Sequence, residues 1–372
     1  MLIMPIITLF YQENGLGMKD VLLLQGIYSV AIVSLEIPSG YFADVWGRKS
    51  TLIIGSFLGV IGFTIYSFTY GFWGFLIAEL TLGIGQSFIS GSDSALLYDT
   101  LKEEQREDEY VKIEGRVLSI GNFAETLAAV IGGFLAEISL RTPFIAQIFI
   151  AMIAIPAAIG LIEPKSIINK KDKWKAIIDT LRLTILKNKE MQFLIILTAF
   201  IGTATLTMAW FIQPYLKDIL KLSISEIGIA LAILNLTVGL TSLIAYKIES
   251  RIGKNKTLIF IILSITSSYL FMGFFNHWLV FISIFLFYFT RGIATPVLKD
   301  YINRISTSDI RATVLSVRNF AIRVVFAIAG PFFGWYSDFY NIQAALILAG
   351  GIIFTSSFLS IFFYKYITKK AI

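Results

Sequence analysis

The chain has 372 residues, of which 56% are hydrophobic and only 15% are charged, with a formal net charge of +6. This composition excludes an ordinary soluble protein, because the polar residues lie in short bursts between apolar stretches of about 20 residues. Lipid leaves only helices or closed barrels able to satisfy the backbone, and unbroken apolar runs argue against the alternation of barrel strands. We therefore predict an all-α, polytopic membrane protein that does not bind nucleic acid.

Several reaction classes are also disfavoured by the composition. The chain has no Cys and a single His, His277. Disulfides are excluded, and the usual zinc sites nearly so. No phosphate-binding glycine loop and no paired nucleophile and base are visible, so we expect no enzyme activity, no cofactor, no metal site and no ATP-driven step.

The first apolar stretch, MLIMPIITLF, is about half the length needed to span a bilayer. We expect a first helix truncated at an upstream start; a short re-entrant segment is the alternative. No cleavable signal peptide is visible, because a basic region and a small-residue cleavage site are both missing.

Eleven longer spans follow this short stretch, which makes twelve in total. They are predicted at 21–43, 51–70, 73–98, 114–137, 142–162, 191–214, 225–247, 257–275, 278–298, 313–336 and 342–366.

The longest polar segment, 163–190, divides the chain into an N-terminal half, 1–162, and a C-terminal half, 191–372. Apolar residues recur in this basic segment every three to four positions. We predict that it is a linker containing an amphipathic helix that lies on the cytoplasmic membrane surface.

The distribution of basic residues predicts the orientation. Of the 31 Lys and Arg residues, 24 lie on the side of the turn at 36–50, and only 4 lie on the opposite side. The positive-inside rule therefore places this turn, the linker and both termini on the cytoplasmic side of the membrane. The membrane is expected to be the cell (inner) membrane.

The two halves contain an internal repeat. VLSIGNFA at 117–124 and VLSVRNFA at 314–321 share six of eight residues, and GRKST at 47–51 has a weaker copy, GKNKT, at 253–257. Both halves enter from the cytoplasm, which indicates parallel repeats around an axis along the membrane normal.

The turn after the second span, GYFADVWGRKS, resembles the signature loop of the major facilitator superfamily. The loop pattern, Gly-X-X-X-Asp-X-X-Gly-Arg-Lys, is matched at Gly40, Asp44, Gly47, Arg48 and Lys49. The resemblance, closest to bacterial drug-efflux-like members, covers essentially the whole chain apart from most of the first helix. It implies a twelve-helix fold of two six-helix halves. We also expect the protein to be a monomer.

The signature residues suggest a conformational latch. Asp44 can face the N-terminus of a partner helix, where free N–H groups and the helix dipole favour an anion, and Arg48 can pair with Asp99. The resemblance implies that such contacts stabilise the outward-facing form. In the alternative reading, Arg48 and Lys49 only anchor the topology.

Glu36 and Arg318 lie nearer the cytoplasm, on the second and eleventh spans. These two helices are neighbours across the interface of the halves in the resembled family. We therefore expect Glu36 and Arg318 to form a gating pair.

Charges inside the spans form another group of candidates, because each costs on the order of 2.5–3.5 kcal/mol at the bilayer centre. We expect Glu125 to be the proton-coupling or cation-binding carboxylate, since burial makes a charge state switchable, and Asn122 adds a polar group to its helix. The alternative is a fixed ion pair with an arginine. Arg291 and Arg323 either bind an anionic substrate or neutralise Glu125 and Glu79.

Together with the resemblance, these features predict a secondary active transporter that moves a small organic solute by alternating access. Proton-coupled efflux is the first expectation, and proton-coupled uptake of an anionic nutrient is the alternative. A membrane-embedded enzyme or a channel is a more remote possibility. The expected partners are a small-molecule substrate, protons and the lipid bilayer.

Overall fold

The computed structural model describes residues 1–90, 92–106, 109–163, 188–306 and 311–369, and in these ranges it contains helices and no strand. This confirms the predicted all-α class. The predicted amphipathic helix of the linker falls almost entirely outside the described residues. The helices are α1 (Ile7–Glu13), α2 (Met18–Trp46), α3 (Arg48–Phe68), α4 (Gly71–Ile89), α5 (Ser92–Glu103), α6 (Tyr110–Ile138), α7 (Thr142–Gly160), α9 (Lys189–Pro214), the π-helical turn η3 (Tyr215–Ile219), α10 (Ile224–Ile252), α11 (Lys254–Phe274), α12 (Val280–Arg304), α13 (Arg311–Phe339) and α14 (Ile342–Lys369).

Ten helical segments in the described ranges are long and apolar enough to cross a membrane. The predicted span 114–137 lies within α6, which has 29 residues and is therefore about 43 Å long. The first apolar stretch contributes α1, whose 7 residues are too few to cross. The protein is a multi-pass membrane protein.

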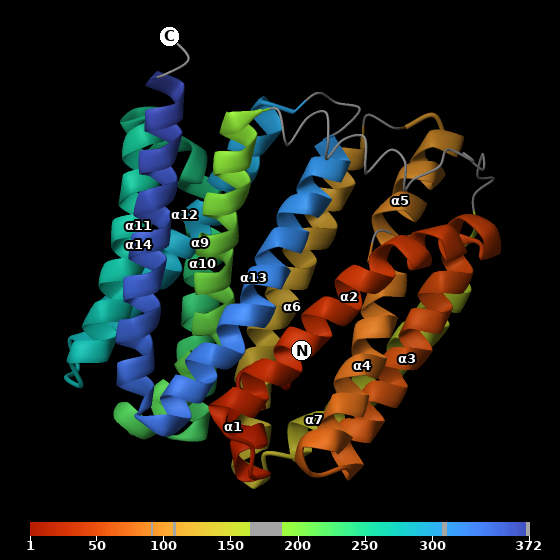
Figure 1. The fold of residues 1–372 in the computed structure, drawn as a ribbon. Coiled ribbons are helices and arrows are strands. Elements are labelled where there is room, and N and C mark those ends of the chain that lie inside the picture. Colours follow the sequence, from red (N-terminus) through yellow and green to blue (C-terminus); the bar gives the residue numbers. More distant parts are fainter. Residues whose placement is uncertain (91, 107–108, 164–187, 307–310, 370–372) are drawn as a thin grey trace. The chain divides into compact units, whose positions relative to one another are not determined.

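The helices form two compact units, which are Met1–Lys170 with Ser223–Ala232, and Lys171–Leu222 with Ile233–Ile372. In the first unit α3 packs against α4 and α7, and α2 packs against α4 (Figure 1). In the second unit α11 packs against α12 and α14, and α9 packs against α13 and α14.

Helix lengths reproduce the internal repeat. Helices α2 and α10 each have 29 residues, and α3 and α11 each have 21, with both pairs offset by 206 positions. Helices α6 and α13, which carry the related octapeptides, also have 29 residues each. The sequence similarity therefore corresponds to a repeated helical architecture.

A single glycine joins the two helices in each copy of the repeat. Gly47 has φ 91° and ψ 150°, and Gly253 has φ 80° and ψ 160°. This backbone region is essentially restricted to glycine. The hydroxyls of Thr51 and Thr257 each donate to the carbonyl of the turn glycine four residues earlier, at 3.5 and 2.9 Å, so the two turns share this hydrogen bond.

Most of the first ten residues pack against the first unit, and Met1 and Met4 are exposed. The backbone N–H of Leu2 donates to Oε1 of Gln147 at 2.8 Å, and the side chains of Phe10 and Tyr11 are fully buried. The carbonyl of Leu2 lies so close to Gly132 of α6 that a Cβ there would clash with it. The buried residues of this segment are therefore part of the packed core.

Arg141 ties together the end of the first unit where α3 and α4 join. Its guanidinium donates to the carbonyls of Ser67 and Thr69, at 2.8 and 3.1 Å, and to Oδ1 of Asn14 at 3.0 Å. It also lies 4.1 Å from the ring centroid of Tyr70. One cation thus satisfies carbonyl groups that the helix end leaves without partners.

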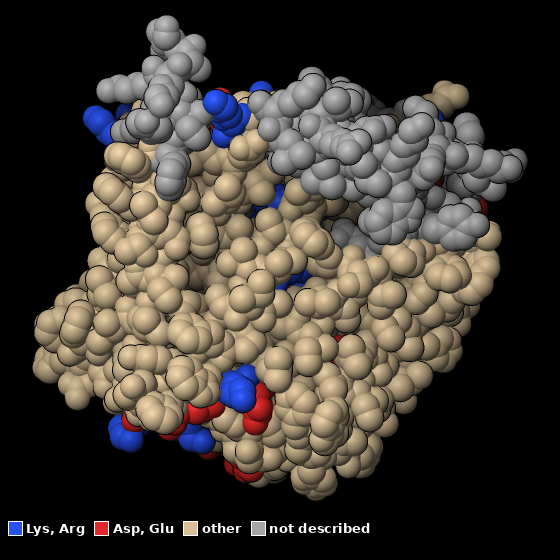
Figure 2. Space-filling view, viewed as in Figure 1, with Lys and Arg blue, Asp and Glu red and all other residues tan. Residues whose placement is uncertain are grey.

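The surface in Figure 2 is mostly uncharged, with most of the visible Lys, Arg, Asp and Glu side chains near its upper and lower edges. Many large apolar side chains of the described residues are exposed, for example Phe149, Leu243 and Ile328. Such extended apolar exposure is unusual for a soluble protein and suits contact with lipid.

We expect Gly253→Ala to destabilise the protein by about 1–3 kcal/mol, because nothing crowds the position but its backbone conformation strains any other residue. Thermal unfolding of the detergent-solubilised protein measures this. Gly239→Ala is the matched control, since Gly239 lies inside α10 with open space around it and should gain helix propensity. Equal melting temperatures for the two variants would contradict the expectation.

Candidate functional site

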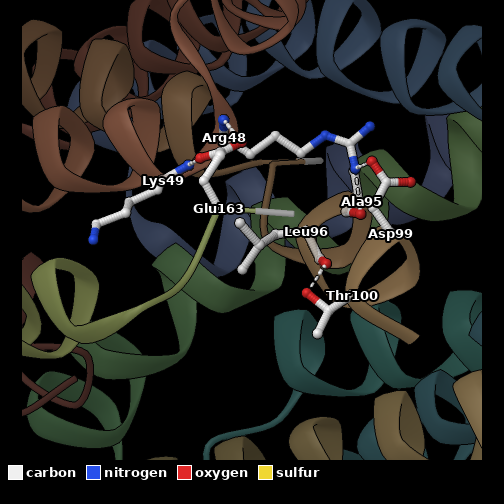
Figure 3. Close-up of polar contacts among 7 residues, drawn as sticks. All are labelled: Arg48, Lys49, Ala95, Leu96, Asp99, Thr100 and Glu163. Carbon is white, nitrogen blue, oxygen red and sulfur yellow. Dashed lines mark hydrogen bonds and ion pairs between the residues drawn. The ribbon is translucent and has the colours of Figure 1, made fainter. Parts of the chain in front are cut away.

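The turn between α2 and α3 is held by Arg48, the first residue of α3. Its guanidinium forms an ion pair with Asp99 and donates to the carbonyl of Ala95, both on α5 (Figure 3). Both members of the pair are largely covered, with 18% and 22% of their side chains exposed. The pair joins α3 to α5, and the sequence had suggested this contact. Its effect on conformation stays a prediction.

Glu163, just beyond the end of α7, caps the start of α3. Its carboxylate accepts the backbone N–H of Arg48 at 2.8 Å and that of Lys49 at 2.6 Å (Figure 3). A carboxylate at this position satisfies free N–H groups and interacts favourably with the helix dipole. A Cβ on Gly47 would lie 3.0 Å from the same carboxylate, so glycine serves both the turn and this close approach.

Sequence reasoning missed this role of Glu163 and treated the residue only as the start of the linker. The available signal was an acidic residue at the end of a span on the same side as the basic turn. Beneath the turn, Leu52, Leu96 and Ala158 form an apolar cluster from α3, α5 and α7. Polar and apolar contacts therefore hold the same three helices.

The second copy of the turn has its own ion pairs. Lys254 pairs with Glu190, which lies in the first turn of α9. Glu249, at the end of α10, accepts from the hydroxyl of Tyr301 at 3.0 Å and lies 3.6 Å from Arg304. The basic residue after the glycine is thus paired with an acidic residue in both units.

Several predicted site residues cannot be placed at the side-chain level. The side chains of Glu36, Asp44 and Asn122, and the surroundings of Gly40, lie outside the described residues, although all four positions belong to helices. Nη1 of Arg318 donates to Oδ1 of Asn319 at 3.0 Å, while its Nε is buried without a partner among the described residues. The pairing of Glu36 with Arg318 and the contact of Asp44 with a helix N-terminus therefore stay predictions.

Glu79 is the buried carboxylate of α4, with 4% of the residue exposed. Its Oε1 accepts from the hydroxyl of Tyr11 at 2.7 Å and from the amide of Gln25, and Tyr66 also forms a hydrogen bond to it. The hydroxyls of Tyr11 and Tyr66 contact each other as well. We call these four residues the Glu79 cluster; α1, α2, α3 and α4 contribute one each.

The Glu79 cluster changes the assignment of the intramembrane charges. Glu79 forms no ion pair with a described residue, and its hydrogen-bond partners in the described chain are neutral. Neutralisation of Glu79 by an arginine, one of the two alternatives for Arg291 and Arg323, is therefore not found among the described residues. Glu125, which was expected to be buried, has an exposed side chain. Sequence reasoning had missed the other cluster members because they are far from Glu79 in the chain.

The two predicted arginines of the second unit are both partly buried. The guanidinium of Arg291 lies 5.8 Å from the ring centroid of Tyr288, a weak cation–π contact. Arg323, on α13, makes no hydrogen bond or ion pair with any described residue. An anion could therefore be accepted by Arg323 without displacing a described partner.

The described residues form a repeated, all-helical, multi-pass membrane fold with a glycine turn in each unit. The Major Facilitator Superfamily model matches the chain twice, over residues 1–211 and 195–371. The chain belongs to the major facilitator superfamily, a family of transporters.

Individual relatives are distant. An MFS-type transporter of Methanocaldococcus jannaschii is 24% identical over 258 residues, 68% of this chain and 64% of the relative, which is less than two thirds of its length. The MFS-type transporter YxaM of Bacillus subtilis is 21% identical over 92% of this chain and 87% of its own. The quinolone resistance protein NorA of Staphylococcus aureus is 24% identical over 44% of this chain and 42% of its own.

Solved structures support the fold alone. The nucleoside transporter NupG superposes with a TM-score of 0.81 at 13% identity, covering 98% of this chain and 95% of its own. A POT family transporter in complex with 5-aminolevulinic acid gives 0.72 at 13% identity, covering 99% and 93%. The predicted major facilitator fold is confirmed.

We expect Arg48→Ala and Asp99→Ala each to lower the melting temperature, and the double variant to lose less than the sum of the two. A partly covered ion pair with good geometry should give a coupling energy of about 1 kcal/mol. Thermal unfolding of the wild type, the two single variants and the double variant gives the double-mutant cycle. Strict additivity would show that the two side chains act independently.

Proposed function

We propose that this protein moves a small organic solute across the membrane by alternating access, as a proton-coupled exporter. The observation that carries the proposal is the repeated glycine turn, built around Gly47 in one unit and Gly253 in the other, with a paired basic residue after each glycine. Two similar rigid units are what a carrier needs in order to rock about a site near the bilayer midplane.

The contacts at the first turn suggest how one end of the carrier is controlled. Arg48, Asp99 and Glu163 hold α3, α5 and the end of α7 as one block. In the proposed latch, Asp44 extends from this block to the N-terminus of a helix in the other half. Each 1.4 kcal/mol that such a contact contributes to the outward-facing state shifts the equilibrium about tenfold.

Export is supported by the similarity to NorA, a quinolone resistance protein. The alternative is uptake of an anionic nutrient, which is favoured by Arg323 without a described partner and by Arg291 on the neighbouring helix α12. A proton gradient drives either direction, depending on whether protons and solute move together or in opposite directions. The two functions therefore differ in substrate charge and in direction.

We expect reconstituted protein to move a solute only in response to an imposed pH gradient. A panel containing a quinolone, an organic anion and a nucleoside is offered to proteoliposomes with the gradient in either direction. Protein-free liposomes and vesicles treated with a proton ionophore are the controls. Solute flux that ignores the gradient would indicate a uniporter or a channel, and gradient-driven accumulation of the anion with protons would favour the alternative.

We expect Asp44→Ala to abolish transport while membrane insertion stays normal, because the latch loses its anion. Asp44→Asn tests the charge alone, and Val45→Ala, at an exposed neighbouring position, is the matched control. Insertion is checked by the yield of monodisperse protein after detergent extraction. Full activity of Asp44→Ala would remove the latch from the mechanism.

A further inference from the structure

We propose that Glu79 is the group that binds and releases the transported proton, and that the hydroxyls of Tyr11 and Tyr66 connect it to the end of the unit where α3 and α4 join. This inference rests on the proposed function and specifies its proton site. It replaces Glu125, which the sequence had favoured for this role. The main observation in its support is that the carboxylate of Glu79 is buried within a membrane-spanning helix and is hydrogen-bonded to neutral groups.

The Glu79 cluster lies inside the membrane span but within reach of one end. Glu79 is eight residues from Gly71, the first residue of α4, which corresponds to a depth of about 12 Å. Tyr66 lies two residues before the last residue of α3. The hydroxyls of Tyr11 and Tyr66 therefore lie next to a carboxylate about 12 Å below the helix ends.

The cluster suits both protonation states of a carboxyl group. The carboxylate accepts hydrogen bonds from the hydroxyl of Tyr11 and the amide of Gln25, which lowers the cost of burying its charge. The protonated acid needs an acceptor for its new O–H, and the phenolic oxygens of Tyr11 and Tyr66 both have lone pairs. Neither state leaves a buried polar group without a partner.

The missing counter-ion distinguishes this site from a structural ion pair. A carboxylate paired with Arg or Lys stays charged, and its removal leaves a buried cation. Glu79 has neutral donors instead, among the described residues. Its charge can therefore change without unbalancing a partner, which a carrier of protons requires.

Other ionisable groups lie on the helices of the cluster and on the elements that contact them. Arg141 is the most relevant of them, because its guanidinium donates to the carbonyl of Tyr66 at 3.4 Å and lies 5.1 Å from the ring of Phe10, the neighbour of Tyr11. Arg141 therefore lies on the α3–α4 side of the cluster. The remaining charged residues on the elements packed around Glu79 are Glu13 on α1, Lys19, Asp20, Glu36 and Asp44 on α2, Arg48 and Lys49 on α3, and Asp93, Asp99, Lys102 and Glu103 on α5.

The proton step involves no covalent change in the solute. A proton from the aqueous phase on one side binds a carboxylate oxygen of Glu79 and forms the neutral acid. After the carrier changes conformation, the O–H bond breaks and the same proton leaves to the other aqueous phase. Charge is balanced within the cycle, and one proton crosses the membrane for each return of Glu79 to its carboxylate form.

The first experiment detects the proton directly. Infrared spectra of the reconstituted protein are recorded while the pH is changed, with no solute present. The pH-induced spectrum of the wild-type protein minus that of Glu79→Gln should contain the C=O band of one protonated carboxylic acid, because the other 24 Asp and Glu residues contribute to both spectra and cancel. Glu13→Gln is the matched control, because Glu13 is an exposed carboxylate on α1, and subtraction of the Glu79→Gln spectrum from its spectrum should still show the band assigned to Glu79.

The second experiment measures coupling with a quinolone as the probe. Glu79→Gln should lose pH-driven accumulation down to the level of the ionophore control, yet keep exchange of labelled for unlabelled quinolone without a gradient. Glu125→Gln is run beside it as the rival. Gradient-driven accumulation by Glu79→Gln, or loss of coupling in Glu125→Gln alone, would overturn this inference while leaving the proposed function intact.

Two further results distinguish failure of the Glu79 assignment from failure of the proposed function and from misfolding of the variant. Wild-type protein that moves no panel solute in response to a gradient would overturn the proposed function, and the coupling role of Glu79 with it. If Glu79→Gln does not fold, Tyr66→Phe takes its place. Removal of one hydroxyl from the cluster should shift the pH at which the infrared band appears, and an unchanged titration would contradict the assignment.

Discussion

The interior of a bilayer contains no water, and every polar group placed there must find its partner in the protein. This constraint accounts for the all-helical fold and for the position of the charges along the chain. It also means that each polar group buried in the protein needs a hydrogen-bond partner. Arg141 satisfies the carbonyls of Ser67 and Thr69 at a helix end, and the Glu79 cluster satisfies a carboxylate with neutral hydrogen-bond donors. A buried polar group costs free energy unless it is hydrogen-bonded, and the groups named here have hydrogen-bond partners.

The repeated turn shows how two units can share a backbone and differ in their side-chain chemistry. Gly47 and Gly253 adopt nearly the same conformation, and each begins a 21-residue helix. The first turn is closed by Asp99 and capped by Glu163, whereas Lys254 in the second pairs with Glu190 at the start of α9. Because these contacts engage different helices, a substitution at one turn leaves the ion pairs of the other turn in place.

Two carboxylates inside predicted spans turned out to have different environments. Glu125 stood near the middle of its span and next to polar residues, so depth along one helix favoured it. Burial depends on which faces of neighbouring helices meet, and this is where Glu79 differs: Tyr11, Gln25 and Tyr66 come from three other helices. Hydropathy and spacing along one helix carry no information about such convergence. The cap formed by Glu163 was missed for the same reason, since 115 positions separate it from Arg48.

The amino-acid sequence by itself determined the class of fold, the positions of most spans, the internal repeat and the family signature at Gly47, Arg48 and Lys49. These features depend on local hydropathy, on helix length and on a backbone conformation that only glycine adopts readily. Tertiary structure decided which carboxylate is buried and which groups donate to it. It also decided that the start of α3 is capped from the end of α7. Those outcomes depend on contacts between helices distant in the chain, because desolvation and hydrogen bonding are properties of the assembled site.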